Sequence, residues 1–257
     1  MNSNFLFSSL FIFIIGNCIG SFLNCFIYRL EHKKTLKGRS FCPQCSHQLS
    51  WKDLFPVFSF LFLKGKCRYC RKKISIQYPL VEFFTGLIFL IIFQRFQFSS
   101  ILEIIFLFYV SSALIIIFVY DFKKYLIPDK VLFPAIAVVF IFRLVFEFSL
   151  LSNYFLAVLI GSGFFLFIFL ISKGNWMGFG DVKLAILMGL LVGFPNILVA
   201  LFLAFFSGSI IGIALMIVKR KKLKSEIPFG PFLITGTFIA LFFGEKIINW
   251  YTSFFVY

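Results

Sequence analysis

Eight apolar runs, separated by short polar or basic stretches, constrain the fold of this chain more than any other feature. The 257 residues have a mean hydropathy of +1.00, and only 14% of them are charged. A helix of about 20 apolar residues crosses the hydrocarbon layer of a membrane, and a soluble domain does not keep such a composition. The sequence therefore predicts an all-α polytopic membrane protein with about eight transmembrane helices in the lipid bilayer. The runs cover approximately residues 5–28, 79–94, 101–120, 131–148, 154–172, 182–193, 196–218 and 227–243.

Two of these runs bear on the number of crossings. The first has no basic residue before it and is too long for a cleaved signal peptide, so we expect it to be retained as the first transmembrane helix. The sixth, residues 182–193, is short, and only the sequence GFPN separates it from the seventh. Eight spans, or seven with one re-entrant helix, are both compatible with the sequence.

The basic residues lie in alternate loops. The segment from Arg29 to Lys73 holds 12 of the 25 Lys and Arg residues, and the sequence KRKKLK at residues 219–224 holds another five. If eight helices cross with the N-terminus outside, only Arg95, Arg143 and Lys246 lie on the opposite side. Basic residues concentrate in cytoplasmic loops. The net charge of +15 is thus explained by topology, and no nucleic-acid partner is expected.

Residues 30–77 form the one long polar segment, which predicts a small cytoplasmic domain between the first two membrane helices. It contains two C-x-x-C pairs separated by 21 residues. Each such turn presents two sulfurs to one metal, so the pattern predicts a structural Zn²⁺ site in a zinc-knuckle domain. Disulfides are not expected in the reducing cytosol, and unmetallated or redox-active cysteines remain the alternative. The four predicted ligands are Cys42, Cys45, Cys67 and Cys70.

Three aspartates lie near the ends of apolar runs, and the topology places all three on the cytoplasmic side. Asp129 follows a proline and precedes the fourth run, which is typical of a helix N-cap. Asp181 could cap the sixth run in the same way. Asp121 ends the third run, where the helix dipole is negative and a carboxylate does not help as a cap.

Two glycines precede Asp181. Gly178 and Gly180 allow strained turns or a close approach of another chain, neither of which an ordinary helix cap needs. A peptide substrate lying beside Asp181 would need that space, so the glycines favour a chemical role for this carboxylate.

Six short motifs, in this order along nearly the whole chain, resemble those of the type IV prepilin leader peptidases. These are membrane aspartyl proteases of the G-x-G-D type, which also process type II secretion pseudopilins. Besides the paired C-x-x-C sequences, the motifs are GSFLNCFIYRL (20–30), YPLVEFFTG (78–86), YDFKKYLIPD (120–129), GFGDVKL (178–184) and PFGPFLITG (228–236).

The resemblance implies that Asp121 and Asp181 form a catalytic pair in a multi-pass protein of the bacterial inner membrane. The substrates would be prepilins or pseudopilins, cut at the cytoplasmic face. Many members of the family also methylate the new N-terminus with S-adenosylmethionine. The expected domains are residues 1–29 as the first transmembrane helix, 30–77 as the cytoplasmic tetracysteine zinc domain, and 78–257 as the transmembrane aspartyl protease domain.

Three further charged residues have structural and functional interpretations. Glu82 either pairs with a basic residue of the cytoplasmic domain or helps to hold a substrate amine or methyl donor, since acids inside a membrane are often functional. Arg143 and Glu147, four residues apart in one run, are expected to form an ion pair.

Two other classes of protein compete with the peptidase. A proton- or ion-coupled transporter would carry acids near the membrane midplane within repeated halves. A catalytically inactive zinc-knuckle scaffold would use its helices only as an anchor, which leaves Asp121 and Asp181 unexplained.

Overall fold

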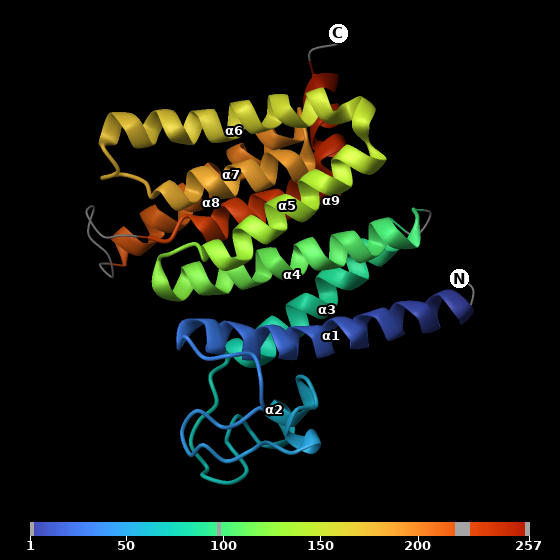
Figure 1. Cartoon of the computed structure of the whole chain (residues 1–257), viewed down its shortest axis with the longest axis vertical. Helices are drawn as coiled ribbons and strands as arrows, with labels where there is room; N and C mark the ends of the chain where they lie inside the picture. Colours follow the sequence, from blue (N-terminus) through green and yellow to red (C-terminus); the bar gives the residue numbers. More distant parts are fainter. Residues whose placement is uncertain (1–2, 97–98, 219–226, 255–257) are drawn as a thin grey trace. The chain divides into compact units, whose positions relative to one another are not determined.

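The computed structural model describes residues 3–96, 99–218 and 227–254, and this part of the chain is helical with no regular strand (Figure 1). Each predicted apolar run forms a helix, so the predicted all-α fold is confirmed. The basic sequence at residues 219–224 lies outside the described residues. The helices are α1 (Ser3–Glu31), α2 (Phe58–Phe62), α3 (Gln77–Arg95), α4 (Ile101–Lys124), α5 (Asp129–Phe146), α6 (Leu151–Ser172), α7 (Phe179–Val192), α8 (Asn196–Ile217) and α9 (Gly230–Ser253), with short 3₁₀ helices η1 (Trp51–Asp53) and η2 (Phe148–Leu150).

Six helices within the described residues are long and apolar enough to cross a membrane: α1, α3, α4, α6, α8 and α9. The helix α5 carries three charged residues among its 18. The helix α7 has 14 residues and is therefore about 21 Å long, less than the roughly 30 Å of a hydrocarbon layer. Nine of its residues are buried, which identifies α7 as an inner helix surrounded by protein.

The chain forms two compact units, residues 1–116 and 117–257, with the division inside α4. In the first unit, α1 and α3 pack closely because glycines face each other. A Cβ atom on Gly16 would lie 2.7 Å from the Cα of Gly86, and one on Gly20 would lie 2.7 Å from the Cα of Glu82. Small residues four apart let membrane helices approach in this way. This contact explains Gly20 of the GSFLNCFIYRL motif and Gly86 of the YPLVEFFTG motif.

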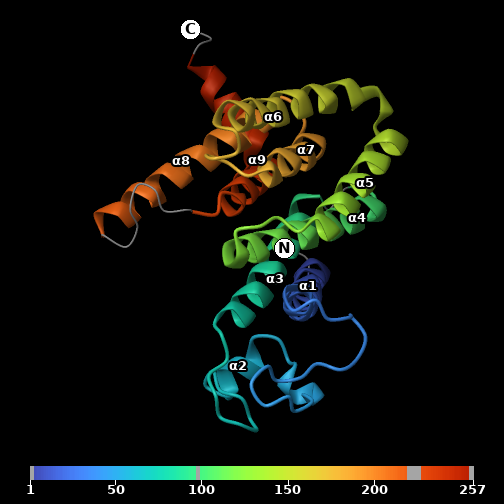
Figure 2. The ribbon, with the colours of Figure 1, turned by 60° about the vertical axis from the view of Figure 1, so that its left-hand side comes forward.

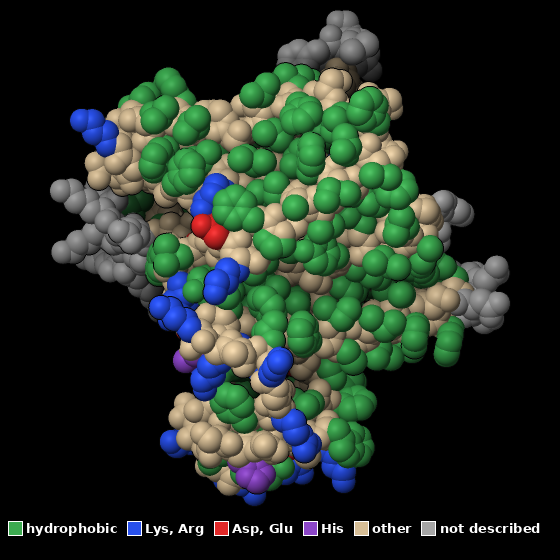
Figure 3. Space-filling model, viewed as in Figure 1, with side chains coloured by type: hydrophobic (Ala, Val, Ile, Leu, Met, Phe, Trp, Pro, Cys, Tyr) green, Lys and Arg blue, Asp and Glu red, His purple; other side chains and the backbone are tan. Residues whose placement is uncertain are grey.

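In the second unit, α7 packs against α5, α6 and α9, and α8 packs against α9 (Figure 2). The α4–α5 and α6–α7 loops lie at the same, left-hand end of these helices in Figure 1. The α5–α6 and α7–α8 connections therefore lie at the other end. The face in Figure 3 is covered by apolar side chains over the helices, and Lys and Arg gather over residues 30–77 at the bottom of the view.

Candidate active site and metal centre

The two C-x-x-C turns have the same backbone structure. The Cys42 N–H donates to His47 O and the Ser46 N–H to Cys42 O, both at 2.9 Å. The second turn repeats these bonds, with Cys67 N–H to Lys72 O at 2.9 Å and Arg71 N–H to Cys67 O at 3.0 Å. One antiparallel bridge closes each turn, Phe41 with Gln48 and Lys66 with Lys73.

The four cysteine sulfurs lie within 4.8 Å of one another, as the spacing predicted. The Sγ atoms of Cys42 and Cys70 are 4.0 Å apart, and all four cysteines are free. A disulfide needs about 2.05 Å, whereas Zn–S bonds of about 2.3 Å in a tetrahedron put sulfurs about 3.8 Å apart. The donor set therefore fits a tetrahedral metal ion.

Cys42 and Cys67, the first cysteines of the two turns, differ in how their surroundings affect ionisation of the thiol. Burial raises the pKa of Cys42 to about 11. At Cys67 burial also opposes ionisation, but the N–H groups of Cys70 and Tyr69 and the neighbouring thiols outweigh it and lower the pKa to about 7. The surroundings of Cys67 thus favour the thiolate, which is the form that binds metal.

Asp53, which the sequence did not single out, joins the two turns. Its Oδ1 accepts the Arg68 Nε–H at 2.7 Å, and its Oδ2 accepts hydroxyl groups of Ser50 at 2.8 Å and Tyr69 at 3.1 Å. Burial opposes the ionisation of Asp53, but these donors together hold its pKa below the usual value. The carboxylate thus connects the residues after the first turn to those inside the second.

Glu82 in α3 is buried and contacts the cysteine segment. Its Oε2 accepts the Val57 N–H at 2.7 Å. One interpretation of Glu82 required a contact with the polar segment. That contact is present, but it is made through a backbone N–H rather than a basic side chain.

Asp121 lies in the last two turns of α4 and is only 5% exposed. Its Oδ2 accepts the N–H of Gly230, the first residue of α9, at 3.0 Å. A Cβ atom on Gly230 would lie 2.6 Å from the same oxygen, so this carboxylate position requires glycine. Sequence reasoning missed Gly230 as a site residue, and its one signal was its place in the PFGPFLITG motif.

Asp181 lies in the first turn of α7, two residues after its first residue, and is partly exposed. Its own N–H donates to the carbonyl oxygen of Gly178, the N-cap residue, at 3.2 Å. The carboxylate of Asp181 therefore lies in the first helical turn, where a negative charge is stabilised, without Asp181 being the N-cap itself. It is also close enough to Asp121 for the two carboxylates to interact electrostatically. The structure thus brings together the two aspartates that the motifs singled out.

The prediction that Asp129 caps a helix is wrong. The N-cap of α5 is Pro128, Asp129 is the first helical residue, and no side-chain cap bond is formed. Instead, Asp129 forms an ion pair with Lys183 of α7. An opposite charge from a neighbouring helix is a better partner for this carboxylate than the backbone amides of its own helix.

The glycines before Asp181 act through space rather than strain. The backbone of Gly178 is extended, with φ −75°, and Gly180 is not among the described residues with positive φ. Of the two possibilities for these glycines, strained turns are not found here, because α7 begins with an ordinary extended N-cap. The α4–α5 loop does approach Gly180 closely, since a Cβ atom on this glycine would lie 3.3 Å from the Cβ of Ile127.

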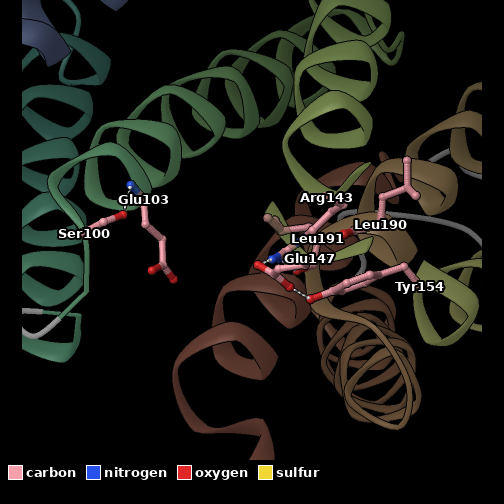
Figure 4. Close-up of polar contacts among 7 residues, drawn as sticks. All are labelled: Ser100, Glu103, Arg143, Glu147, Tyr154, Leu190 and Leu191. Carbon is pink, nitrogen blue, oxygen red and sulfur yellow. Dashed lines mark hydrogen bonds and ion pairs between the residues drawn. The ribbon is translucent and has the colours of Figure 1, made fainter. Parts of the chain in front are cut away.

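The far end of α7 is held by Arg143 of α5, as Figure 4 shows. Arg143 forms the predicted ion pair with Glu147. It also donates to the backbone carbonyls of Leu190 at 3.3 Å and Leu191 at 2.8 Å, and its guanidinium lies 4.4 Å from the ring centre of Tyr154. A cation at a helix C-terminus satisfies free carbonyls and complements the dipole. The Arg143 cluster therefore anchors the helix that carries Asp181.

Comparison with known proteins identifies the family of this chain. The profile described as "Bacterial Peptidase A24 N-terminal domain" matches residues 14–96, and "Type IV leader peptidase family" matches residues 105–213. A prepilin leader peptidase/N-methyltransferase of Aeromonas salmonicida is 31% identical over 274 residues, covering 94% of this chain and 93% of the relative. The chain belongs to the type IV leader peptidase family.

Two other relatives have the same name. The protein of Bacillus subtilis is 32% identical over 243 residues, covering 93% of this chain and 96% of the relative. That of Legionella pneumophila is 29% identical over 280 residues, covering 96% of each. No solved structure matches the chain significantly. The family profiles together include both aspartates and all four clustered cysteines.

Proposed function

We propose that this chain is a membrane-embedded aspartic endopeptidase that removes the leader peptide from type IV prepilins or type II secretion pseudopilins. Membership of the type IV leader peptidase family and the names of its relatives support this activity. The assignment of the catalytic residues rests on one observation. Asp121 of α4 and Asp181 of α7 are 60 positions apart in sequence, yet their carboxylates are close enough to interact electrostatically.

The two carboxylates are well placed to share one proton. Each lies at the start of a helix, since Asp121 accepts the N–H of Gly230 of α9 and Asp181 belongs to the first turn of α7. Helix N-termini stabilise negative charge, and two close carboxylates do not both ionise readily. One member of the pair is then a base while the other is an acid.

Peptide cleavage follows from this arrangement. The ionised carboxylate takes a proton from water as the water oxygen bonds to the scissile carbonyl carbon, and the protonated carboxyl donates a hydrogen bond to the carbonyl oxygen. As the C–N bond breaks, a proton passes from the pair to the leaving amine. The products are a free leader carboxylate and a new N-terminal amine.

The surroundings of the pair suit a substrate with a basic leader and an apolar helix. Phe122 follows Asp121 directly, and Phe179 lies two residues before Asp181. Both side chains are more than half exposed and offer apolar surface. Basic residues in the loops after α4 and α6 agree with a cytoplasmic location. We place both aspartates and residues 30–77 at the cytoplasmic face of the bacterial inner membrane.

The cysteine segment is proposed to hold structural Zn²⁺ through Cys42, Cys45, Cys67 and Cys70. Four mutually close sulfurs support it, and a closed four-thiolate site leaves no open position for catalysis. In this proposal the chain divides into a first transmembrane helix (1–29), the tetracysteine zinc domain (30–77) and the aspartyl protease domain (78–257).

Methylation of the new N-terminus with S-adenosylmethionine is proposed as a second activity. Its support is the double name of the relatives. Mass spectrometry of a processed pilin tests it, because a methyl group adds about 14 Da, and an unmodified N-terminus after complete cleavage would refute it.

The peptidase is tested by co-expressing the chain with a prepilin in a bacterium that lacks its own peptidase, and following the leader by gel shift. Wild type and Asp129→Asn should process the prepilin. Asp121→Asn and Asp181→Asn should lose at least about 10³-fold in rate while still inserting in the membrane. Cleavage by either of these variants would refute the catalytic pair. A wild type that cuts no prepilin would instead favour the transporter or the scaffold.

A further inference from the structure

A basic cavity lies where α1 ends, in the first unit of the chain. Its volume is about 730 Å³, and the lining includes Lys33, Lys34, Lys37 and Arg39 together with the polar side chains of Ser46 and Gln48. Among the described residues that line this cavity, none is acidic. A concave surface with four exposed or partly fixed cations and no lining carboxylate has a strong positive potential.

Arg29 builds the wall of this cavity. It is 4% exposed, and its guanidinium donates to the carbonyls of five successive residues, 35–39. The bonds to Lys37 O and Gly38 O measure 3.0 and 2.8 Å. Gly38, with φ +101°, allows the segment to curl around the guanidinium. The basic loop is therefore organised before any ligand arrives, which lowers the cost of binding.

The cations are held near one another by this loop. The Nζ of Lys34 lies 4.8 Å from the ring centre of Phe41 and 5.6 Å from that of Tyr28. Lys33, Lys37 and Arg39 are exposed and come from the same seven residues. Like charges gathered in this way repel one another, and an anion in the cavity would offset that repulsion.

The charge of the cavity excludes two ligands that the proposed function requires. A prepilin leader is basic, and S-adenosylmethionine has a net positive charge because its sulfonium and ammonium groups outweigh its one carboxylate. The apolar span of α1 ends at Glu31, so the cavity begins at the membrane surface. The anion concentrated there is the phosphate of acidic phospholipids, which basic pockets beside membrane helices recognise.

We propose that this cavity binds the phosphate headgroup of an anionic phospholipid, such as phosphatidylglycerol. The lipid would tie residues 33–39 to the membrane surface beside α1. The lipid site contains no residue of the aspartate pair, so lipid binding and cleavage can be measured separately.

Native mass spectrometry of the full chain in detergent tests the proposal, with phosphatidylglycerol or phosphatidylcholine added. Wild type should retain phosphatidylglycerol and not phosphatidylcholine. The triple variant Lys33→Gln/Lys37→Gln/Arg39→Gln should weaken retention at least about 10-fold. The control Lys52→Gln/Lys64→Gln/Lys73→Gln removes the same charge from exposed residues of the same segment that do not line the cavity, and should bind as wild type does.

Three results would overturn the lipid site. They are unchanged retention in the triple variant, equal loss in the control, and displacement of the lipid by millimolar inorganic phosphate, which would indicate a site for free phosphate. Should the triple variant fail to fold, Lys37→Gln alone, an exposed side chain of the loop, should still give a partial loss.

Discussion

The cysteine segment and the inner helix α7 are stabilised in opposite ways. Within residues 30–77 only Cys42 and Cys67 are buried, so two side chains of the cysteine cluster take the place of a core. In α7, nine of 14 residues are buried, nearly all of them apolar. The first region depends on sulfur chemistry and a few polar contacts, whereas the second depends on packing. A chelator should therefore unfold the cysteine segment and leave α7 folded, while point substitutions should destabilise each region by a different mechanism.

Removing the metal should have the largest effect and should be confined to the cysteine segment. Structural zinc sites contribute about 10–16 kcal/mol in small domains, and this segment has no other core. A strong chelator should make residues 30–77 sensitive to trypsin while circular dichroism of the membrane helices changes little. Protection of the segment after complete metal removal, or a general loss of helix, would contradict the comparison.

Gly230→Ala should reduce cleavage by about 10²-fold or more with little loss of thermal stability. The added methyl would lie 2.6 Å from the Asp121 Oδ2 and must displace that carboxylate. The matched control is Gly163→Ala in α6, where a Cβ atom meets nothing within 4 Å. Leader cleavage and the melting temperature are measured for both. Equal activity of the two variants would remove Gly230 from the site.

Arg143→Gln should destabilise the second unit by about 3 kcal/mol, because Glu147 and the last carbonyls of α7 lose a buried cation. Cleavage should fall as well, since α7 carries Asp181. Chemical unfolding in detergent measures the stability, with Arg95→Gln, an exposed arginine at the end of α3, as the control. A variant that melts with wild type would show that packing alone holds α7.

Asp53→Asn should have the smallest effect, about 1 kcal/mol, because Arg68 is half exposed and the hydroxyl donors can still bond an amide oxygen. The pKa of Asp53 is lowered in the folded chain, so its contribution is complete well above the usual value and is lost only as the pH falls through that lowered pKa. The chelator midpoint of the variant should therefore shift equally at pH 6 and pH 8. A shift that grows with pH would point to the cysteines instead.

The elements of the fold that rest on local patterns could be predicted from the sequence. Each of the eight apolar runs marks a helix, and six of these helices are long and apolar enough to cross a membrane, which needs about 20 such residues. The four-sulfur cluster could also be predicted from local patterns, because each C-x-x-C turn fixes the positions of its own two sulfurs.

Contacts between distant residues could not be predicted in this way. Gly230 donates a backbone N–H to Asp121, 109 residues earlier, and a backbone donor has no side chain that marks it in sequence. The carbonyl acceptors of Arg143 are hidden for the same reason. Asp129 was misassigned because a preceding proline indicates a helix start without indicating which partner the carboxylate takes from α7.

The likeness of the two C-x-x-C turns has a consequence for how the proposed metal centre would assemble. A single turn offers two sulfurs, so alone it would hold a tetrahedral ion only by meeting a second copy, at a rate set by protein concentration. Here the 21 residues between Cys45 and Cys67 tether one half-site to the other. The encounter becomes intramolecular, with an effective concentration in the millimolar range. The centre can then form on each newly made chain, however few copies the membrane contains.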